Sequence, residues 1–162
     1  MNITMRTLIF LLTLIGSATA AAGELTVVDA WVREAPPGAT VLAGFLVIQN
    51  HSPQDRELVA AESTDFGRVE LHRTVVEGGV ARMLPQQSMP VPAGGQLDLE
   101  PGGYHLMLMQ PKRPLAEGDS VNLTLRFDDG STQAVSMRVR KAPAMGGHPM
   151  NEQGSAHGTT AE

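Results

Sequence analysis

The chain of 162 residues contains no cysteine. It therefore forms no disulfide and has no thiol for redox chemistry or lipid attachment. A blue-copper electron-transfer centre is excluded as well, because such a centre needs a cysteine ligand. An exported protein without disulfides must take its stability from a packed core.

Basic residues are also few, with 12 Lys and Arg against 17 Asp and Glu and a formal net charge of −5 at pH 7. Phosphate binding requires concentrated positive charge, so we expect no nucleic-acid partner. No apolar run beyond residue 22 approaches the roughly 20 residues that span a bilayer. We therefore expect no stable membrane insertion of the mature protein.

Residues 1–22 have the pattern of a secretory signal peptide. A single positive side chain, Arg6, precedes the apolar run 8–16, and Ala18-Thr19-Ala20 forms a small-x-small cleavage site. We predict removal of this segment near Ala20 to Ala22 and export of the mature protein.

Residues 23–140 show short stretches of alternating polarity, separated by Gly, Pro, Asn and Asp, and no convincing helix pattern. The strand candidates are 24–33, 43–49, 57–61, 67–75, 80–83, 96–99, 104–109, 121–127 and 134–140. Roughly eight or nine short strands in about 120 residues predict an all-β, Greek-key β-sandwich. The predicted core residues are Trp31, Phe45, Val69, Leu71, Leu106, Leu108, Leu123, Leu125 and Phe127.

Residues 141–162 change in composition and have too few apolar side chains to order themselves, so we predict a flexible C-terminal tail. This tail contains Met145, His148, Met150 and His157. Two interpretations stay open: a segment that captures Cu(II), and a soluble terminus with no binding role.

Two histidines and two methionines follow the spacing His72-x10-Met83-x21-His105-x-Met107. Strand alternation places His72, and likewise His105 and Met107, on the side opposite the apolar core positions, facing outward. Imidazole and thioether donors suit Cu(I), whereas Ca²⁺ and Mg²⁺ prefer oxygen. The pattern therefore predicts a Cu(I) site built from four neutral ligands at the surface.

Several alternatives remain open for neighbouring residues. Glu70 shares the face of His72, which makes it a solvated carboxylate, an acceptor that orients the ring, or a direct ligand. The last case, with His105, gives a two-His-one-carboxylate metalloenzyme, although it leaves the two methionines unexplained. Met89 and Met109 are either secondary ligands or packing residues. A metal-free sandwich for adhesion or assembly is a further alternative.

The sequence resembles the periplasmic copper chaperones called PCuAC. It meets the H-x10-M-x21-H-x-M motif of that family at all four positions without a spacing error. The supporting stretches are 29–33, 36–38, 69–72, 91–95, 101–109 and 112–115, and the resemblance extends from residue 25 to about residue 139. Many relatives carry another methionine shortly after the first motif histidine, where this chain has Thr74 and Val75.

This resemblance implies a cupredoxin-like β-sandwich in the periplasm, without enzymatic activity, that binds Cu(I) through His72, Met83, His105 and Met107. It implies delivery of the ion to the binuclear copper centre of cytochrome c oxidase, alone or with a Sco-type partner. Some members carry a Met- and His-containing extension that takes Cu(II), to which the tail of this chain is similar.

Overall fold

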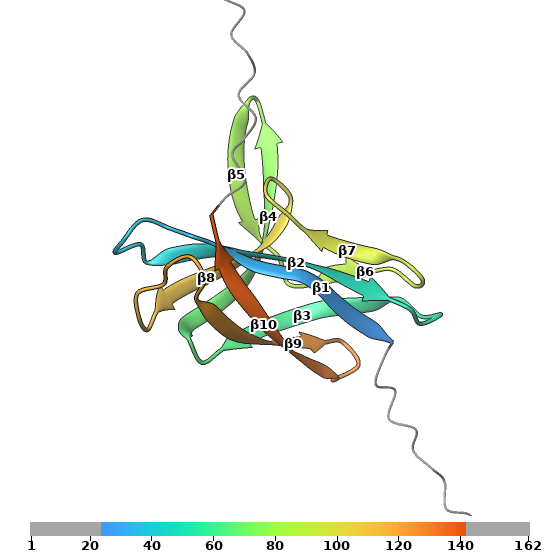
Figure 1. The fold of residues 1–162 in the computed structure, drawn as a ribbon. Helices are drawn as coiled ribbons and strands as arrows, with labels where there is room; N and C mark the ends of the chain where they lie inside the picture. Colours follow the sequence, from blue (N-terminus) through green and yellow to red (C-terminus); the bar gives the residue numbers. More distant parts are fainter. Residues whose placement is uncertain (1–23, 142–162) are drawn as a thin grey trace, which may run out of the picture.

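The computed structural model describes residues 24–141 (Figure 1). These residues form ten strands: β1 (Leu25–Arg33), β2 (Val41–Asn50), β3 (Arg56–Ser63), β4 (Phe66–Glu77), β5 (Val80–Pro85), β6 (Met89–Val91), β7 (Gln96–Leu99), β8 (Tyr104–Pro111), β9 (Ser120–Phe127) and β10 (Thr132–Arg140). The predicted signal peptide and the tail beyond Lys141 lie outside the described residues. Within residues 24–141, no helix is long and apolar enough to cross a membrane.

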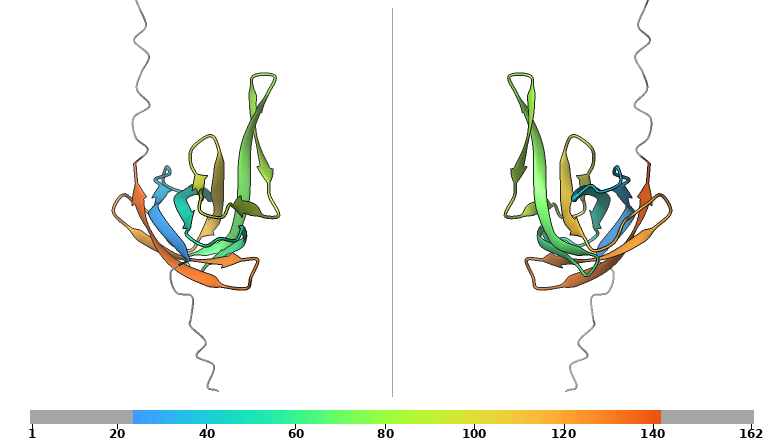
Figure 2. Two further views of the ribbon diagram at one scale, coloured as in Figure 1. Left: turned by 90° about the vertical axis from the view of Figure 1, so that its right-hand side faces the viewer. Right: turned by 90° about the vertical axis from the view of Figure 1, so that its left-hand side faces the viewer.

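The described strands hydrogen-bond into one continuous sheet in the order β5-β4-β8-β7-β2-β1-β10-β9-β3-β6. This sheet curls until β3 contacts β4 and β6 contacts β7, so that its concave face encloses the core (Figure 2). The first and last strands pair in parallel, whereas most other neighbours are antiparallel. The predicted all-β class is confirmed, and the two faces of the expected sandwich are parts of a single sheet.

Alternating apolar side chains supply the core. In β9 every second residue from Val121 to Phe127 is buried, as predicted. Val69 is only partly buried and packs against this core. Trp31 and Phe45 are buried on the other side of the sheet, where their ring centroids lie 4.7 Å apart. They pack against each other because the strands pair them directly.

The short strand β6 was not predicted, because its three residues have a central proline and are too few to show an alternation of polar and apolar side chains. Met89 begins this strand and is fully buried in the core. Of the two interpretations open for Met89, the structure therefore supports packing.

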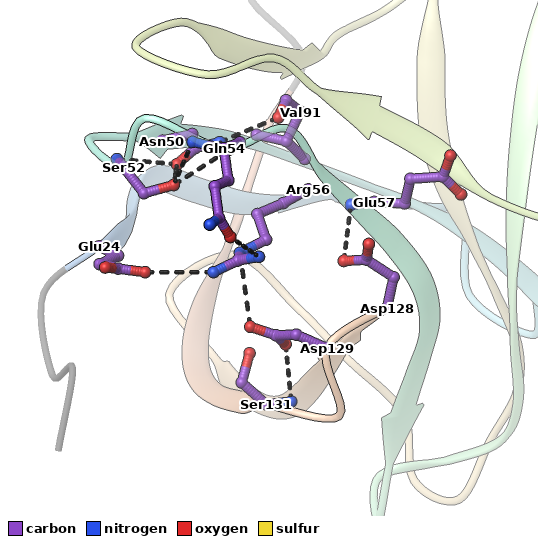
Figure 3. Close-up of polar contacts among 10 residues, drawn as sticks. All are labelled: Glu24, Asn50, Ser52, Gln54, Arg56, Glu57, Val91, Asp128, Asp129 and Ser131. Carbon is purple, nitrogen blue, oxygen red and sulfur yellow. Dashed lines mark hydrogen bonds and ion pairs between the residues drawn. The ribbon is translucent and has the colours of Figure 1, made fainter. Parts of the chain in front are cut away.

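A polar network joins strand ends at the edge of the body (Figure 3). The guanidinium of Arg56 lies 3.3 Å from Glu24 Oε2 and 3.4 Å from Asp129 Oδ2, which links β3 to the start of β1 and to the β9–β10 turn. Beside it, the buried amide of Asn50 donates to the carbonyl oxygens of Gln54 and Val91. These contacts hold together loops that are far apart in the sequence.

Strands β4 and β5 form a hairpin that projects from the body (Figures 1 and 2). Glu77 pairs with Val80, leaving Gly78 and Gly79 as a two-residue turn with φ of 59° and 79°. Only glycine takes such angles readily at both turn positions, which explains why the hairpin reverses here. The hairpin holds Met83 away from the core.

Candidate metal site

His72 of β4 and His105 of β8 lie directly opposite each other in the sheet, with ring centroids 5.9 Å apart. Both occupy the face opposite the core, as predicted from strand alternation. The prediction that these positions face solvent is wrong for the histidines, whose residues are only 7% and 4% exposed. Each ring shields the other, and the carboxylate of Glu70 contacts His72.

Each ring uses one nitrogen for a protein hydrogen bond. His72 Nε2 donates to Glu70 Oε2 at 3.0 Å, and His105 Nδ1 donates to the carbonyl oxygen of Gly103 at 3.2 Å. The remaining nitrogens, His72 Nδ1 and His105 Nε2, are buried and have no hydrogen-bond partner. Leaving a buried polar atom unpaired costs roughly 1–3 kcal/mol, so two such atoms in facing rings require an explanation.

A metal ion shared by the two rings would supply that explanation. With a metal–nitrogen distance of about 2 Å, two imidazoles that bind one ion have centroids roughly 5–6 Å apart. The observed separation of 5.9 Å falls within this range. The residues present therefore fit a metal ligated by two histidines.

The electrostatics of His105 also suit ligation. Burial lowers the pKa of His105 below the ordinary 6.5, the hydrogen bond to Gly103 acts in the opposite direction, and the charge of a protonated His72 lowers it further. The imidazole is therefore neutral at pH 7, and its lone pair is free to bind a metal.

The two methionines share the histidine face but flank the rings from opposite directions. Met107 is partly buried, follows His105 by two residues and pairs with Glu70. Met83 pairs with Thr74, two residues beyond His72, and is 60% exposed on the hairpin. The structure thus brings the two histidines together, sets Met107 beside them, and holds Met83 on a projecting element.

Glu70 does not supply a free carboxylate to this site. Its Oε1 accepts from Arg68 at 2.9 Å, while its Oε2 is occupied by His72. Among residues 24–141, no group of three or more His, Asp or Glu side chains is arranged to hold a metal. The described residues therefore do not offer the ligand set of the metalloenzyme alternative.

Sequence reasoning missed Arg68 and Gly103. Arg68 contacts both Glu70 and the sulfur of Met109, the latter at 3.5 Å, so Met109 already has a polar partner. The alternation Arg68-x-Glu70-x-His72 was a signal for the first contact. Gly103 acts through its backbone carbonyl, which leaves no signal in residue identity.

A family described as "Putative lipoprotein LpqE-like" matches residues 25–139. The chain is 39% identical over 120 residues to "Putative lipoprotein Lxx21020" of Leifsonia xyli subsp. xyli, covering 74% of this chain and 71% of that protein.

Among solved structures, apo-DR1885 from Deinococcus radiodurans is 34% identical, with a TM-score of 0.59 over 88% of this chain and 97% of that one. The Cu(I) form of DR1885 aligns with a TM-score of 0.56 at the same identity, over 77% and 85% of the two chains. A copper-bound PCuAC domain from PmoF2 aligns at 0.63 over 74% and 95%, and its 19% identity supports the fold alone. The predicted cupredoxin-like fold is thereby confirmed.

Proposed function

Since the chain belongs to the LpqE-like family and shares the fold of PCuAC domains, we propose that it is a copper chaperone that binds one Cu(I) and passes it on. The observation that carries this proposal is the pair of buried, unpartnered nitrogens in the facing rings of His72 and His105. The Cu(I)-bound structure of DR1885, at 34% identity, supports the choice of metal.

We propose that His72, Met83, His105 and Met107 form the complete ligand set. Four neutral donors around Cu(I) leave a complex with a single positive charge, and two soft sulfurs favour the reduced ion. The two rings are buried, whereas Met83 is the most exposed of the four. Met83 is therefore the ligand that a recipient protein replaces first during stepwise exchange.

The proposed recipient is the binuclear copper centre of cytochrome c oxidase, reached directly or through a Sco-type partner in the periplasm. The spacing of the four ligand residues supports this choice, because it matches the motif of the PCuAC chaperones. Capture of Cu(II) by Met145, His148, Met150 and His157 remains a separate prediction, since these residues lie outside the described range.

Anaerobic titration with Cu(I) against a competing chelator tests the ligand set. Replacing Met83 and Met107 together by leucine removes both sulfurs and keeps apolar side chains of similar volume. We expect Cu(I) affinity to fall on the order of 100-fold or more, equivalent to about 2.8 kcal/mol.

The matched control for this titration is Met109→Leu. Met109 lies on the same strand face as Met107, but its sulfur contacts Arg68. We expect the control to keep wild-type affinity. Equal affinities for the wild type and the double variant would refute the thioether ligands, and copper-free protein after anaerobic purification with Cu(I) would favour a metal-free module.

A further inference from the structure

We propose that Glu70 is a positioning residue that makes the two histidines bind copper through different nitrogens, His72 through Nδ1 and His105 through Nε2. This inference rests on the proposed copper-binding function of the same site. The inference specifies which nitrogen of each histidine binds the ion, and it names Glu70 as the side chain that selects the nitrogen of His72.

The hydrogen bond between His72 and Glu70 selects the nitrogen on β4. Residues two apart on a strand share a face, which brings the Glu70 carboxylate within 3.0 Å of His72 Nε2. An ionised carboxylate only accepts hydrogen bonds, so the ring proton resides on Nε2. The lone pair is then on Nδ1, the buried atom without a partner.

Arg68 holds the second oxygen of the same carboxylate. Its guanidinium lies 2.9 Å from Glu70 Oε1, and the same terminal nitrogen contacts the sulfur of Met109 at 3.5 Å. An exposed ion pair of this kind adds little stability by itself. Its consequence here is orientation, because a carboxylate held at one oxygen presents the other to His72.

His105 is oriented by the backbone instead. The carbonyl oxygen of Gly103 accepts from His105 Nδ1 at 3.2 Å and from the Thr74 amide at 3.0 Å. A carbonyl cannot donate, so the proton of His105 resides on Nδ1 and its lone pair on Nε2. No substitution of a side chain removes this acceptor, which makes His105 an internal reference for changes at His72.

Metal-bound histidines usually donate their other ring proton to a carboxylate or a carbonyl, and loss of such a partner costs 10- to 100-fold in metal affinity. Here His72 donates to a carboxylate, and His105 donates to a backbone carbonyl. A purely structural role for Glu70 would stabilise the fold without deciding which nitrogen of His72 binds the ion.

Long-range ¹H–¹⁵N correlation NMR of the apo and Cu(I)-loaded full chain distinguishes these roles. In the apo protein we expect the proton on His72 Nε2 and on His105 Nδ1. On addition of Cu(I), the resonances of His72 Nδ1 and His105 Nε2 should shift as the bound nitrogens. Copper on His72 Nε2, with the proton on Nδ1, would overturn the proposal.

Two variants separate the charge of Glu70 from its hydrogen bond. Glu70→Ala removes the acceptor, and we expect both nitrogens of His72 to be populated as ligands and Cu(I) affinity to fall about 10-fold or more. Glu70→Gln keeps an acceptor oxygen, so it should retain Nδ1 ligation and part of the affinity. It also keeps the test valid if the alanine variant fails to fold.

The control is Glu62→Ala, which also removes a carboxylate paired with an arginine: Glu62 of β3 pairs with Arg126 of β9 and takes no part in the contacts of Glu70. We expect this control to keep wild-type affinity and ligation. Wild-type ligation and affinity in both Glu70 variants would overturn the positioning role while leaving the chaperone intact. Absence of Cu(I) binding by the wild type would overturn the proposed function itself, whereas the apo spectra would still report the two tautomers.

Discussion

At the scale of single residues, the site consists of two imidazoles that the fold buries without completing their hydrogen bonds. His72 and His105 each satisfy one nitrogen and leave the other unpaired. Such atoms destabilise the metal-free fold, by roughly 1–3 kcal/mol each, and a bound ion removes that cost. The same residues therefore account for metal affinity and for a less stable apo protein.

The lowered pKa of His105 predicts how the stability of the apo protein depends on pH. Because the folded state holds this pKa below 6.5, the unfolded chain binds a proton at higher pH than the folded chain does. The stability contribution of neutral His105 is therefore complete above pH 6.5 and is lost as the pH falls through the lowered pKa. The titratable side chain of His72 faces this ring across the sheet.

Urea unfolding of the metal-free protein between pH 7.5 and pH 5 measures this effect. We expect the free energy of unfolding to fall with decreasing pH more steeply in the wild type than in His105→Gln. The exposed loop residue His51 provides the control, since His51→Gln should leave the wild-type slope unchanged. Equal slopes for the wild type and His105→Gln would show that burial of His105 does not influence its protonation.

Strand alternation was sufficient to predict which residues share a face, but not which of them are buried. It placed His72 on the side of its strand opposite the core, and His105 and Met107 on the corresponding side of theirs, because the side-chain period of a strand is two. Burial of the rings depends on the pairing of β4 with β8, which brings His72 opposite His105 across 33 positions of sequence. No local pattern contains that register.

At the scale of elements, the hairpin β4–β5 and the loop around Asn50 differ in how they are held to the body. The hairpin projects and presents Met83, whereas the loop is held by a buried amide that makes four hydrogen bonds. The strand limits predicted for this hairpin, 67–75 and 80–83, are shorter than the observed ones, because the exposed ends of β4 and β5 lack a clear polar and apolar alternation. Pairing next to the turn extends β4 to Glu77, and pairing with Arg73 and His72 extends β5 at its far end to Pro85.

The loop predicts a large effect of one substitution. Asn50 is 1% exposed; its amide donates to Gln54 and Val91, and its oxygen accepts the amide and the hydroxyl of Ser52. Asn50→Ala removes four hydrogen bonds at a buried position, so we expect a loss of about 2–4 kcal/mol in the free energy of unfolding. Urea denaturation measures it, with the neighbouring Gln49→Ala expected to change stability by less than about 1 kcal/mol. A similarly small effect of Asn50→Ala would show that the network does not hold the loop.

At the scale of the whole molecule, the residues that stabilise the fold and the proposed metal ligands lie on opposite faces of one curled sheet. The core lies inside the curl, while the histidines and methionines lie on the outer face of β5, β4 and β8. Changing the ligands therefore leaves the main core intact. The alternating polarity of the chain predicted this all-β body, but the single continuous sheet follows from long-range pairings such as β1 with β10, which no segment indicates alone.

X-ray absorption of the Cu(I)-loaded protein tests the central claim most directly, because it counts the neighbours of the metal by element. We predict two nitrogen and two sulfur neighbours per copper in the wild type, and one sulfur in Met83→Leu. A wild-type spectrum with nitrogen or oxygen neighbours and no sulfur would contradict the claim that His72, Met83, His105 and Met107 hold one Cu(I) ion.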